Sequence, residues 1–468
     1  MKTEQKTQSS FINEQQIAEA MASASNKDDS HVRDVLTKAR QLHGLELDEV
    51  AVLTSITDPQ LLHELFETAR YVKETIYGRR LVLFAPLYIS NLCSNECLYC
   101  AFRARSKAIT RRALNQDEIR REIEILVAEG HKRTLLVAGE SYPKEGFSYI
   151  LKSIETIYSV KLGNGEIRRV NVNIAPLTSD EFRQLKDAHI GTYQLFQETY
   201  HRQTYRQVHL AGKKIDYDWR VTAMDRAMEA GIDDVGIGVL FGLCDWRFEI
   251  LAMMQHIRHL EAEFGVGPHT ISVPRLEPAA GSEMSIHPPR PVSDFDFRKI
   301  VAILRLAVPY TGIIMTTREN PEMRRDTFAL GVSQISAGSK TNPGGYAEGK
   351  EILNQAQFAL GDHRSLDEVI YDITQLGYIP SFCTACYRLG RTGEDFMDLA
   401  KPGLIKEHCQ PNALSTYLEY LLDYASPQTR QAGERLIEQA LQQMDTLTRR
   451  RTEAMLQKVR TGKRDVYC

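Results

Sequence analysis

Short runs of apolar and β-branched residues alternate with amphipathic stretches through the middle of the chain, and this rhythm predicts alternating strands and helices. Eight such runs predict strands, at residues 81–90, 134–140, 170–176, 192–199, 234–242, 269–278, 311–319 and 333–341. Between them lie stretches of helical period; in the clearest, Asn115 is the expected N-cap and Gly130 the stop. Eight strand–helix units over about 290 residues match a (β/α)8 barrel of the TIM type. A doubly wound open sheet alternates in the same way, and we favour the barrel because the count is eight.

The two ends of the chain have a different character. Residues 1–30 are polar and predict a mobile or loosely docked arm, and residues 31–78 carry helical patterns. Further helical patterns follow Leu366. We therefore expect an N-terminal arm with helices (1–78), an α/β barrel (79–365) and a mainly helical C-terminal extension (366–468).

The composition is that of a soluble globular protein, with 43% hydrophobic and 25% charged residues among 468. A net charge of -3 gives no field that favours nucleic acid or an acidic membrane as a partner. The N-terminus resembles no signal peptide, and no apolar run reaches the ~18–20 residues that span a bilayer. We expect a cytoplasmic protein, in which thiols stay reduced and grouped cysteines indicate metal binding.

Six of the eight cysteines form two triplets with no fourth cysteine nearby: Cys93, Cys97 and Cys100, then Cys383, Cys386 and Cys409. Structural metal sites usually have four protein ligands, whereas a reactive site keeps one position open. Two triplets therefore suggest two iron–sulfur clusters, each with an open corner. For the second triplet a zinc site completed by His408 is an alternative, because both metals accept a Cys-x2-Cys element.

The first triplet, with Tyr99 directly before its last cysteine, resembles the signature of the radical S-adenosylmethionine (SAM) superfamily. The resemblance implies a 4Fe–4S cluster whose open iron binds SAM and starts a deoxyadenosyl radical, on a barrel of the kind predicted above. It also implies SAM contacts from strand ends. The segment Ala-Gly-Glu resembles a Gly-Gly-Glu motif of that superfamily and would supply Gly139 and Glu140 as SAM contacts. Two further segments that resemble SAM-contact segments would supply Glu198 and Gly238.

The second triplet extends the resemblance to the HydG family, the tyrosine lyases of FeFe-hydrogenase maturation. The segments GPHTISVPRLEPA, MTTRE, SAGSKTNPGGY and SFCTACYRLGRTG are similar to that family. This resemblance implies that L-tyrosine is cleaved at Cα–Cβ to p-cresol and dehydroglycine (2-iminoacetate), which then yields carbon monoxide and cyanide for an iron unit of the hydrogenase. It further implies a second 4Fe–4S cluster with an extra iron, bridged by an exogenous cysteine and supported by His269. The implied partners are tyrosine, SAM, a ferredoxin- or flavodoxin-type reductant and other maturation proteins.

A substrate amino acid needs a cation for its carboxylate. Arg318, at the end of the seventh predicted strand, can bind a carboxylate bidentately with hydroxyl support from Thr316. An ion pair with the neighbouring Glu319 is the alternative, and Arg275 is a second candidate. Three other functions stay open: 2-iminoacetate synthesis for the thiamine thiazole, radical SAM chemistry on another substrate, and a non-catalytic iron–sulfur carrier.

Overall fold

Eight parallel strands form a closed barrel in the computed structural model, which describes residues 11–25, 27–349, 356–400 and 405–468. The last barrel strand pairs with the first, at Val82 and Gln334, so the eight strands close into a barrel. This closure confirms the predicted barrel and excludes the open sheet. The strands, in their order around the barrel, are β1 (Arg80–Ser90), β2 (Arg133–Ala138), β5 (Arg169–Asn173), β6 (Tyr193–Gln194), β7 (Val235–Gly238), β8 (Thr270–Ser272), β9 (Gly312–Met315) and β10 (Val332–Ser336).

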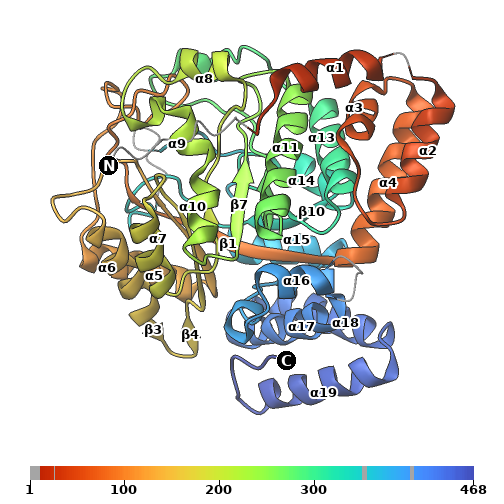
Figure 1. Ribbon diagram of the computed structural model, residues 1–468. Helices are drawn as coiled ribbons and strands as arrows, with labels where there is room; N and C mark the ends of the chain where they lie inside the picture. Colours follow the sequence, from red (N-terminus) through yellow and green to blue (C-terminus); the bar gives the residue numbers. More distant parts are fainter. Residues whose placement is uncertain (1–10, 26, 350–355, 401–404) are drawn as a thin grey trace.

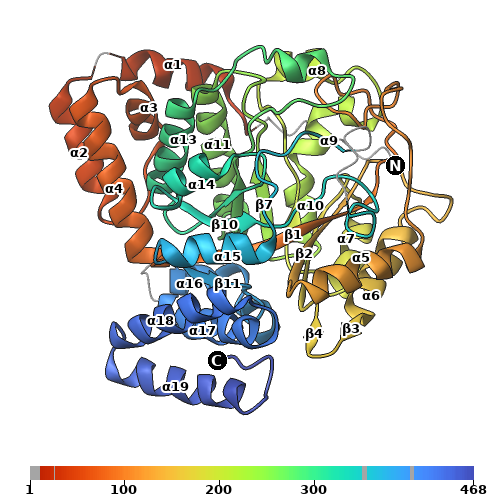
Figure 2. The same cartoon turned by 180° about the vertical axis from the view of Figure 1, so that it is seen from behind.

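Helices between the strands lie on the outside of the barrel (Figures 1 and 2). In α5 (Gln116–Ala128) the Asn115 side chain accepts a hydrogen bond from the Glu118 N–H, as the cap predicted. Thr178 and Asp216 cap α7 and α9 in the same way, each accepting a hydrogen bond from a backbone N–H of the first turn. The remaining elements of this region are α6 (Ser148–Ser159), the hairpin β3 (Lys161–Leu162) and β4 (Gly165–Glu166), α7 (Ser179–Asp187), α8 (Arg202–Val208), η1 (Lys213–Ile215), α9 (Tyr217–Val221), α10 (Ala223–Glu229), α11 (Trp246–Phe264), α12 (Glu283–Ile286), α13 (Asp294–Ala307) and α14 (Pro321–Phe328).

Four helices precede the barrel: α1 (Glu14–Ala24), α2 (Asp29–Ala39), α3 (Leu47–Ser55) and α4 (Pro59–Tyr77). The expected loose arm is wrong for residues 14–24, which form α1. Ile17, Ala20 and Ala24 fall on one face of this helix and are buried, and α1 packs against α3 and α11. Three apolar residues at helical spacing give an otherwise polar segment a face that packs against the neighbouring helices. Residues 1–10 lie outside the described residues.

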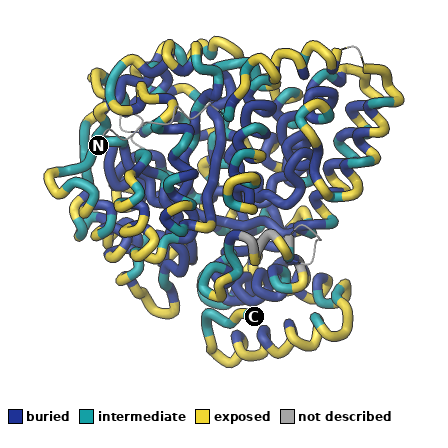
Figure 3. The backbone as a smooth tube through the Cα atoms, in the orientation of Figure 1, coloured by how far each residue is buried: buried dark blue, intermediate teal, exposed yellow. Residues whose placement is uncertain are grey.

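The C-terminal extension attaches to the lower end of the first barrel strand. It comprises α15 (Leu366–Gln375), β11 (Ile379–Ser381), η2 (Cys386–Leu389), α16 (Gly393–Ala400), α17 (Lys406–Asp423), α18 (Pro427–Gln442) and α19 (Thr446–Arg460). Strand β11 pairs in parallel with the first three residues of β1. Figure 3 shows a buried face of these helices toward the barrel and an exposed outer face along α19.

The two cysteine triplets consequently lie at opposite ends of the barrel. The first triplet follows the C-terminal end of β1. The second triplet follows β11, which pairs with the N-terminal end of β1. Since a strand rises about 3.3 Å per residue, the two ends of β1 are on the order of 33 Å apart. None of the helices in the described ranges has the length and apolarity needed to cross a membrane.

Candidate active site and second cysteine site

The first cysteine triplet lies in the loop after β1, and hydrogen bonds connect this loop to residues 208–211. Glu96 and Leu98 donate backbone hydrogen bonds to the carbonyls of Ala211 and Val208. The Tyr99 hydroxyl lies 2.9 Å from His209 Nε2. All three thiols are free. Together with residues of β2, η1 and the segment after β6 they line a cavity of about 90 Å³, to which Tyr99, Gly139, Glu140 and Glu198 contribute.

Gly139 brings the end of β2 against the cysteine loop. A Cβ built on it would lie 2.2 Å from the carbonyl oxygen of Leu92, so only glycine allows this approach. Gly238 has a different surrounding: its Cβ would lie 2.7 Å from the carbonyl oxygen of Ser272, where β7 meets β8. Gly238 is not part of the lining of the cavity at the cysteines, and packing between strands accounts for it.

Two half-buried carboxylates beside the cysteines are held by cations that the sequence did not single out. Glu140 accepts hydrogen bonds from Arg220 Nη1 (2.9 Å) and Asn95 Nδ2 (2.7 Å), and Glu198 accepts one from Lys214 Nζ (2.7 Å). Although burial opposes it, the Arg220 and Lys214 charges hold the pKa of Glu140 below its usual value. Buried carboxylates require cations, but no local motif says which ones, so sequence reasoning missed this pair.

The backbone of Glu198 is also unusual. Its φ of 70° is one of five positive values outside glycine in the described part of the chain, and another belongs to Cys383. Residues held in this region are strained and often cluster at functional sites. Here the conformation turns the end of β6 so that the Glu198 carboxylate meets Lys214 at the cavity.

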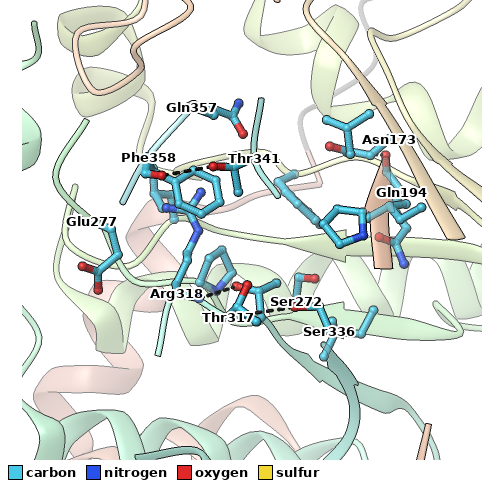
Figure 4. Close-up of a pocket in the computed structure, with 18 of the residues that line it drawn as sticks. Asn173, Gln194, Ser272, Glu277, Thr317, Arg318, Ser336, Thr341, Gln357 and Phe358 are labelled. Atoms are coloured by element: carbon cyan, nitrogen blue, oxygen red, sulfur yellow. Dashed lines mark hydrogen bonds between the residues drawn. The ribbon is translucent and has the colours of Figure 1, made fainter. Parts of the chain in front are cut away.

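A second cavity, of about 140 Å³, continues into the barrel from the cysteines, since Cys100, Tyr99 and Glu198 line it as well. Figure 4 shows Arg318 and Phe358 on one side of it and Asn173 and Gln194 on the other. Apolar side chains supply much of the rest of the wall: Phe84, Leu135, Val137, Leu240, Leu276 and Ile314. The cavity therefore offers a cation, an apolar body and amide groups in one enclosed space.

The guanidinium of Arg318 is held ready for an anion. Its Cζ lies 3.2 Å from the centre of the Phe358 ring, and burial lowers its pKa. The guanidinium itself has no hydrogen bond or ion pair among the described residues. The backbone N–H of Arg318 donates a hydrogen bond to Thr316 Oγ1 at 3.4 Å. The alternative pair with Glu319 does not form, because Glu319 Oε1 accepts from Arg275 Nε at 2.9 Å. Arg275 is thereby committed to Glu319, and the second candidate for the substrate carboxylate is unsupported by the geometry.

The second triplet gathers residues from three elements at the other end of the barrel. Cys383 follows β11, Cys386 begins η2 and Cys409 lies in α17, and all three line one small cavity with Arg80. The Cys386 thiol hydrogen-bonds Cys409, and this bond and the Arg80 guanidinium lower the pKa of the Cys409 thiol. A thiolate is the metal-binding form of cysteine, so this donor set fits a metal cluster.

The histidines near the second triplet face other groups. His408 Nδ1 lies 3.2 Å from Arg391 Nη1 and does not line the cavity at the cysteines. His269 is buried, with Nδ1 3.5 Å from Asp234 Oδ1, and burial lowers its pKa to about 4. It lies outside the lining of that cavity too. Within the described residues, no group of three or more His, Cys, Asp or Glu is arranged to hold a single metal ion.

Two parts of the chain match known families. Residues 87–254 match the Radical SAM superfamily, and residues 272–379 match the Biotin and Thiamin Synthesis associated domain. With the closed barrel and the cysteine loop after its first strand, these matches define a radical SAM enzyme, a class that uses a 4Fe–4S cluster with SAM. In the structure, Cys93, Cys97 and Cys100 are the residues that could hold that cluster.

Individual relatives narrow the class. The 2-iminoacetate synthase of Escherichia coli is 32% identical over 354 residues, which cover 75% of this chain and 90% of the relative. A crystal structure of HydG, a maturase of the FeFe-hydrogenase, is 48% identical, with a TM-score of 0.95 over 98% of this chain and 100% of that one. HydG from Carboxydothermus hydrogenoformans is 41% identical, with a TM-score of 0.82 over 95% and 98% of the two chains. The chain belongs to the HydG family.

Proposed function

We propose that this protein cleaves L-tyrosine between Cα and Cβ, releasing p-cresol and dehydroglycine, and that its C-terminal cysteines serve the conversion of dehydroglycine to carbon monoxide and cyanide. The observation that carries the proposal is the pairing of two free cysteine triplets at opposite ends of one barrel, in a chain that matches HydG over nearly its whole length. SAM bound at the first triplet supplies the radical that removes a hydrogen atom from the substrate.

The chain's own residues account for substrate binding. Arg318 receives the tyrosine carboxylate, since it is the cavity's cation without a protein partner among the described residues. Thr316 supports it from the same strand end. The apolar wall excludes water from the ring and from the radical, and Asn173 and Gln194 on the opposite wall offer amide groups to the phenol hydroxyl.

The residues of the first cavity account for cofactor binding. Cys93, Cys97 and Cys100 ligate the cluster in this proposal, and Tyr99, Gly139, Glu140 and Glu198 contact SAM. Glu140 and Glu198 are already positioned by Arg220 and Lys214, so they meet a charged ligand without rearranging. For Gly238 the geometry supports only a packing role.

The conversion of dehydroglycine to carbon monoxide and cyanide balances in atoms and charge. The dehydroglycine anion carries two carbons, one nitrogen and two oxygens, and the loss of one water leaves one carbon monoxide and one cyanide with no external oxidant. Cys383, Cys386 and Cys409 hold the second 4Fe–4S cluster in this proposal. The extra iron, bridged by an exogenous cysteine and ligated by His269, is the cargo that receives both products for the hydrogenase maturation proteins. Electrons come from a ferredoxin- or flavodoxin-type reductant.

The test is an anaerobic assay of the reconstituted protein with dithionite, SAM and tyrosine, measuring p-cresol, carbon monoxide and cyanide. Cys386→Ser is expected to keep p-cresol and lose carbon monoxide, because it alters only the distant site. Cys97→Ser is expected to abolish both. Absence of p-cresol from the unaltered protein would refute tyrosine cleavage and favour another radical SAM substrate.

One alternative is supported by a specific relative. The 32% identity to 2-iminoacetate synthase also fits an enzyme that releases dehydroglycine for thiamine thiazole synthesis. That function predicts p-cresol without carbon monoxide or cyanide from the unaltered protein. The same assay therefore separates the two functions.

A further inference from the structure

A polar layer of the barrel interior lies directly beneath the substrate cavity. It contains Arg133 on β2, Thr270 on β8 and Gln334 on β10. Each stands two residues before a cavity-lining residue of the same strand, namely Leu135, Ser272 and Ser336. Because residues two apart face the same side of a strand, all three side chains point into the barrel. The layer therefore separates the cavity from the lower end of the barrel.

Arg133 is incompletely satisfied in this layer. The residue is 1% exposed. Nη2 donates to Gln334 Oε1 at 2.9 Å, but Nε and Nη1 have no hydrogen-bond partner in the part of the chain that the structure describes. The hydroxyl of Thr270 is also buried, and no described residue hydrogen-bonds it. An unsatisfied buried donor is destabilising, and more so when it is charged, so such a group calls for an explanation.

The surroundings of Arg133 add to that cost rather than relieve it. Burial and the neighbouring Arg169 lower the pKa of Arg133 to about 9. The carboxylate that could neutralise it, Asp234, is bound by Arg169 instead, with Nη2 2.9 Å from Oδ2. The layer is thus short of one negative charge.

Arg133 also lies toward the second cysteine site. Strand β2 starts at Arg133, and its cross-strand partner on β5 is Arg169. The Cys383 side chain lies close enough to both arginines to raise the pKa of each, against the larger effect of burial. A small molecule that travels inside the barrel from the substrate cavity to the C-terminal cysteines passes this layer.

The layer is closely packed, which limits what can enter it. A Cβ on Gly236 would lie 2.4 Å from Thr270 Oγ1, and one on Gly312 would lie 2.8 Å from Gln334 Nε2. Any ligand of Arg133 is therefore small. A guanidinium is suited to a carboxylate, which can accept several of its hydrogen bonds at once.

We infer that Arg133, assisted by the Thr270 hydroxyl, binds the carboxylate of the two-carbon imino acid between its release in the cavity and its reaction at the C-terminal cysteines. This inference rests on the proposed function. Arg133 holds the fragment inside the barrel and limits its escape to water. Escaped dehydroglycine takes up one water at the imine carbon and gives glyoxylate and ammonia, so leakage is measurable as glyoxylate.

The experiment compares Arg133→Gln and Arg133→Lys with the unaltered protein, all reconstituted and assayed anaerobically with SAM and tyrosine. Arg133→Gln should keep p-cresol within about twofold, while carbon monoxide per p-cresol falls ~10-fold or more and glyoxylate rises to match, as loss of a charge-assisted pair implies. Arg133→Lys should show an intermediate ratio, because it keeps the charge. Thr134→Val is the matched control, since Thr134 is the next residue of β2, on the opposite face, and donates to the Ala85 carbonyl.

Two results would overturn the inference: an unchanged ratio of carbon monoxide to p-cresol in Arg133→Gln, or a parallel loss of both products. Absence of p-cresol from the unaltered protein would instead overturn the proposed function. A measurement without turnover keeps the test decisive if Arg133→Gln folds poorly. Glyoxylate should raise the Tm of the unaltered protein, acetamide should not, and Arg133→Lys should reduce the effect. Equal shifts with glyoxylate and acetamide would also overturn the inference.

Discussion

Replacement of Arg318 tests the proposed substrate site most directly. The guanidinium lines the cavity and is half-buried, has no hydrogen bond or ion pair among the described residues, and lies over the Phe358 ring. Burial lowers its pKa, which means that the folded protein bears a desolvation cost for this charge. A substrate carboxylate would offset that cost and accept its hydrogen bonds.

The magnitude follows from the contacts that would be lost. A charge-assisted hydrogen bond contributes about 1.5–3 kcal/mol, and a guanidinium can offer two to one carboxylate. Arg318→Gln should therefore lose about 3 kcal/mol of transition-state binding, or on the order of 150-fold in kcat/KM for tyrosine. Arg318→Lys keeps the charge but not the planar fork, and should lose about tenfold.

The assay is anaerobic p-cresol formation against tyrosine concentration, with 5'-deoxyadenosine measured in parallel. Arg318→Gln should still cleave SAM, because the proposed SAM site at the first cysteine triplet lies at the other end of the cavity. Its unfolding temperature should be close to that of the unaltered protein, since the half-buried guanidinium has no hydrogen bond or ion pair to lose among the described residues. Arg275→Gln is the matched control: it breaks the pair with Glu319 and should lower the Tm while leaving the KM for tyrosine unchanged. A kcat/KM within threefold of the unaltered value in Arg318→Gln would refute the assignment.

Two other predictions concern the cofactor site and the response to pH. In Gly139→Ala the new Cβ meets the carbonyl oxygen of Leu92 at 2.2 Å, so the cysteine loop must shift and 5'-deoxyadenosine formation should fall at least ~10-fold. Gly267→Ala, whose new Cβ would come no closer than 3.3 Å to side-chain atoms of Glu261 and Tyr310, controls for the substitution itself, and equal activity of the two variants would contradict the prediction. His131 is buried with no partner for either ring nitrogen among the described residues, and burial lowers its pKa to about 3. Between pH 8 and pH 5 the unfolded chain therefore binds a proton at His131 that the folded protein does not bind. The free energy of unfolding should fall by about 2 kcal/mol over this range on account of His131. Urea titrations of His131→Leu should show a smaller fall, and a fall equal to that of the unaltered protein would contradict the reasoning.

Local sequence determined the barrel and the cysteine chemistry. The alternation of apolar strands with capped helices is a property of neighbouring residues, so all eight strands were found and α5 begins at the predicted cap. The same holds for each close cysteine spacing, because a few residues of loop decide whether thiols can share a cluster. The polar character of residues 14–24 led to the wrong prediction of a loose arm, because the burial of α1 depends on the distant helices against which it packs.

The tertiary structure alone decided which charged groups meet. Lys214 and Arg220 reach Glu198 and Glu140 because η1 and α9 fold over the cysteine loop, and no spacing along the chain encodes that approach. The choice between Arg318 and Arg275 likewise needed the ion pair of Arg275 with Glu319. Closure of the barrel, at Val82 and Gln334, brings strands from distant parts of the sequence around one interior.

The sequence by itself therefore determined the kind of chemistry, because metal-binding residue types and strand periodicity are local. The tertiary structure decided where the two cysteine sites lie relative to each other. The pairing of β11 with the start of β1 places the second triplet at the lower end of the barrel, and the alternation of the strands turns Arg133 into the space between. Electrostatic partners and unpaired charges arise only when distant segments exclude water together, and that is why Arg133 could not be recognised before the fold was known.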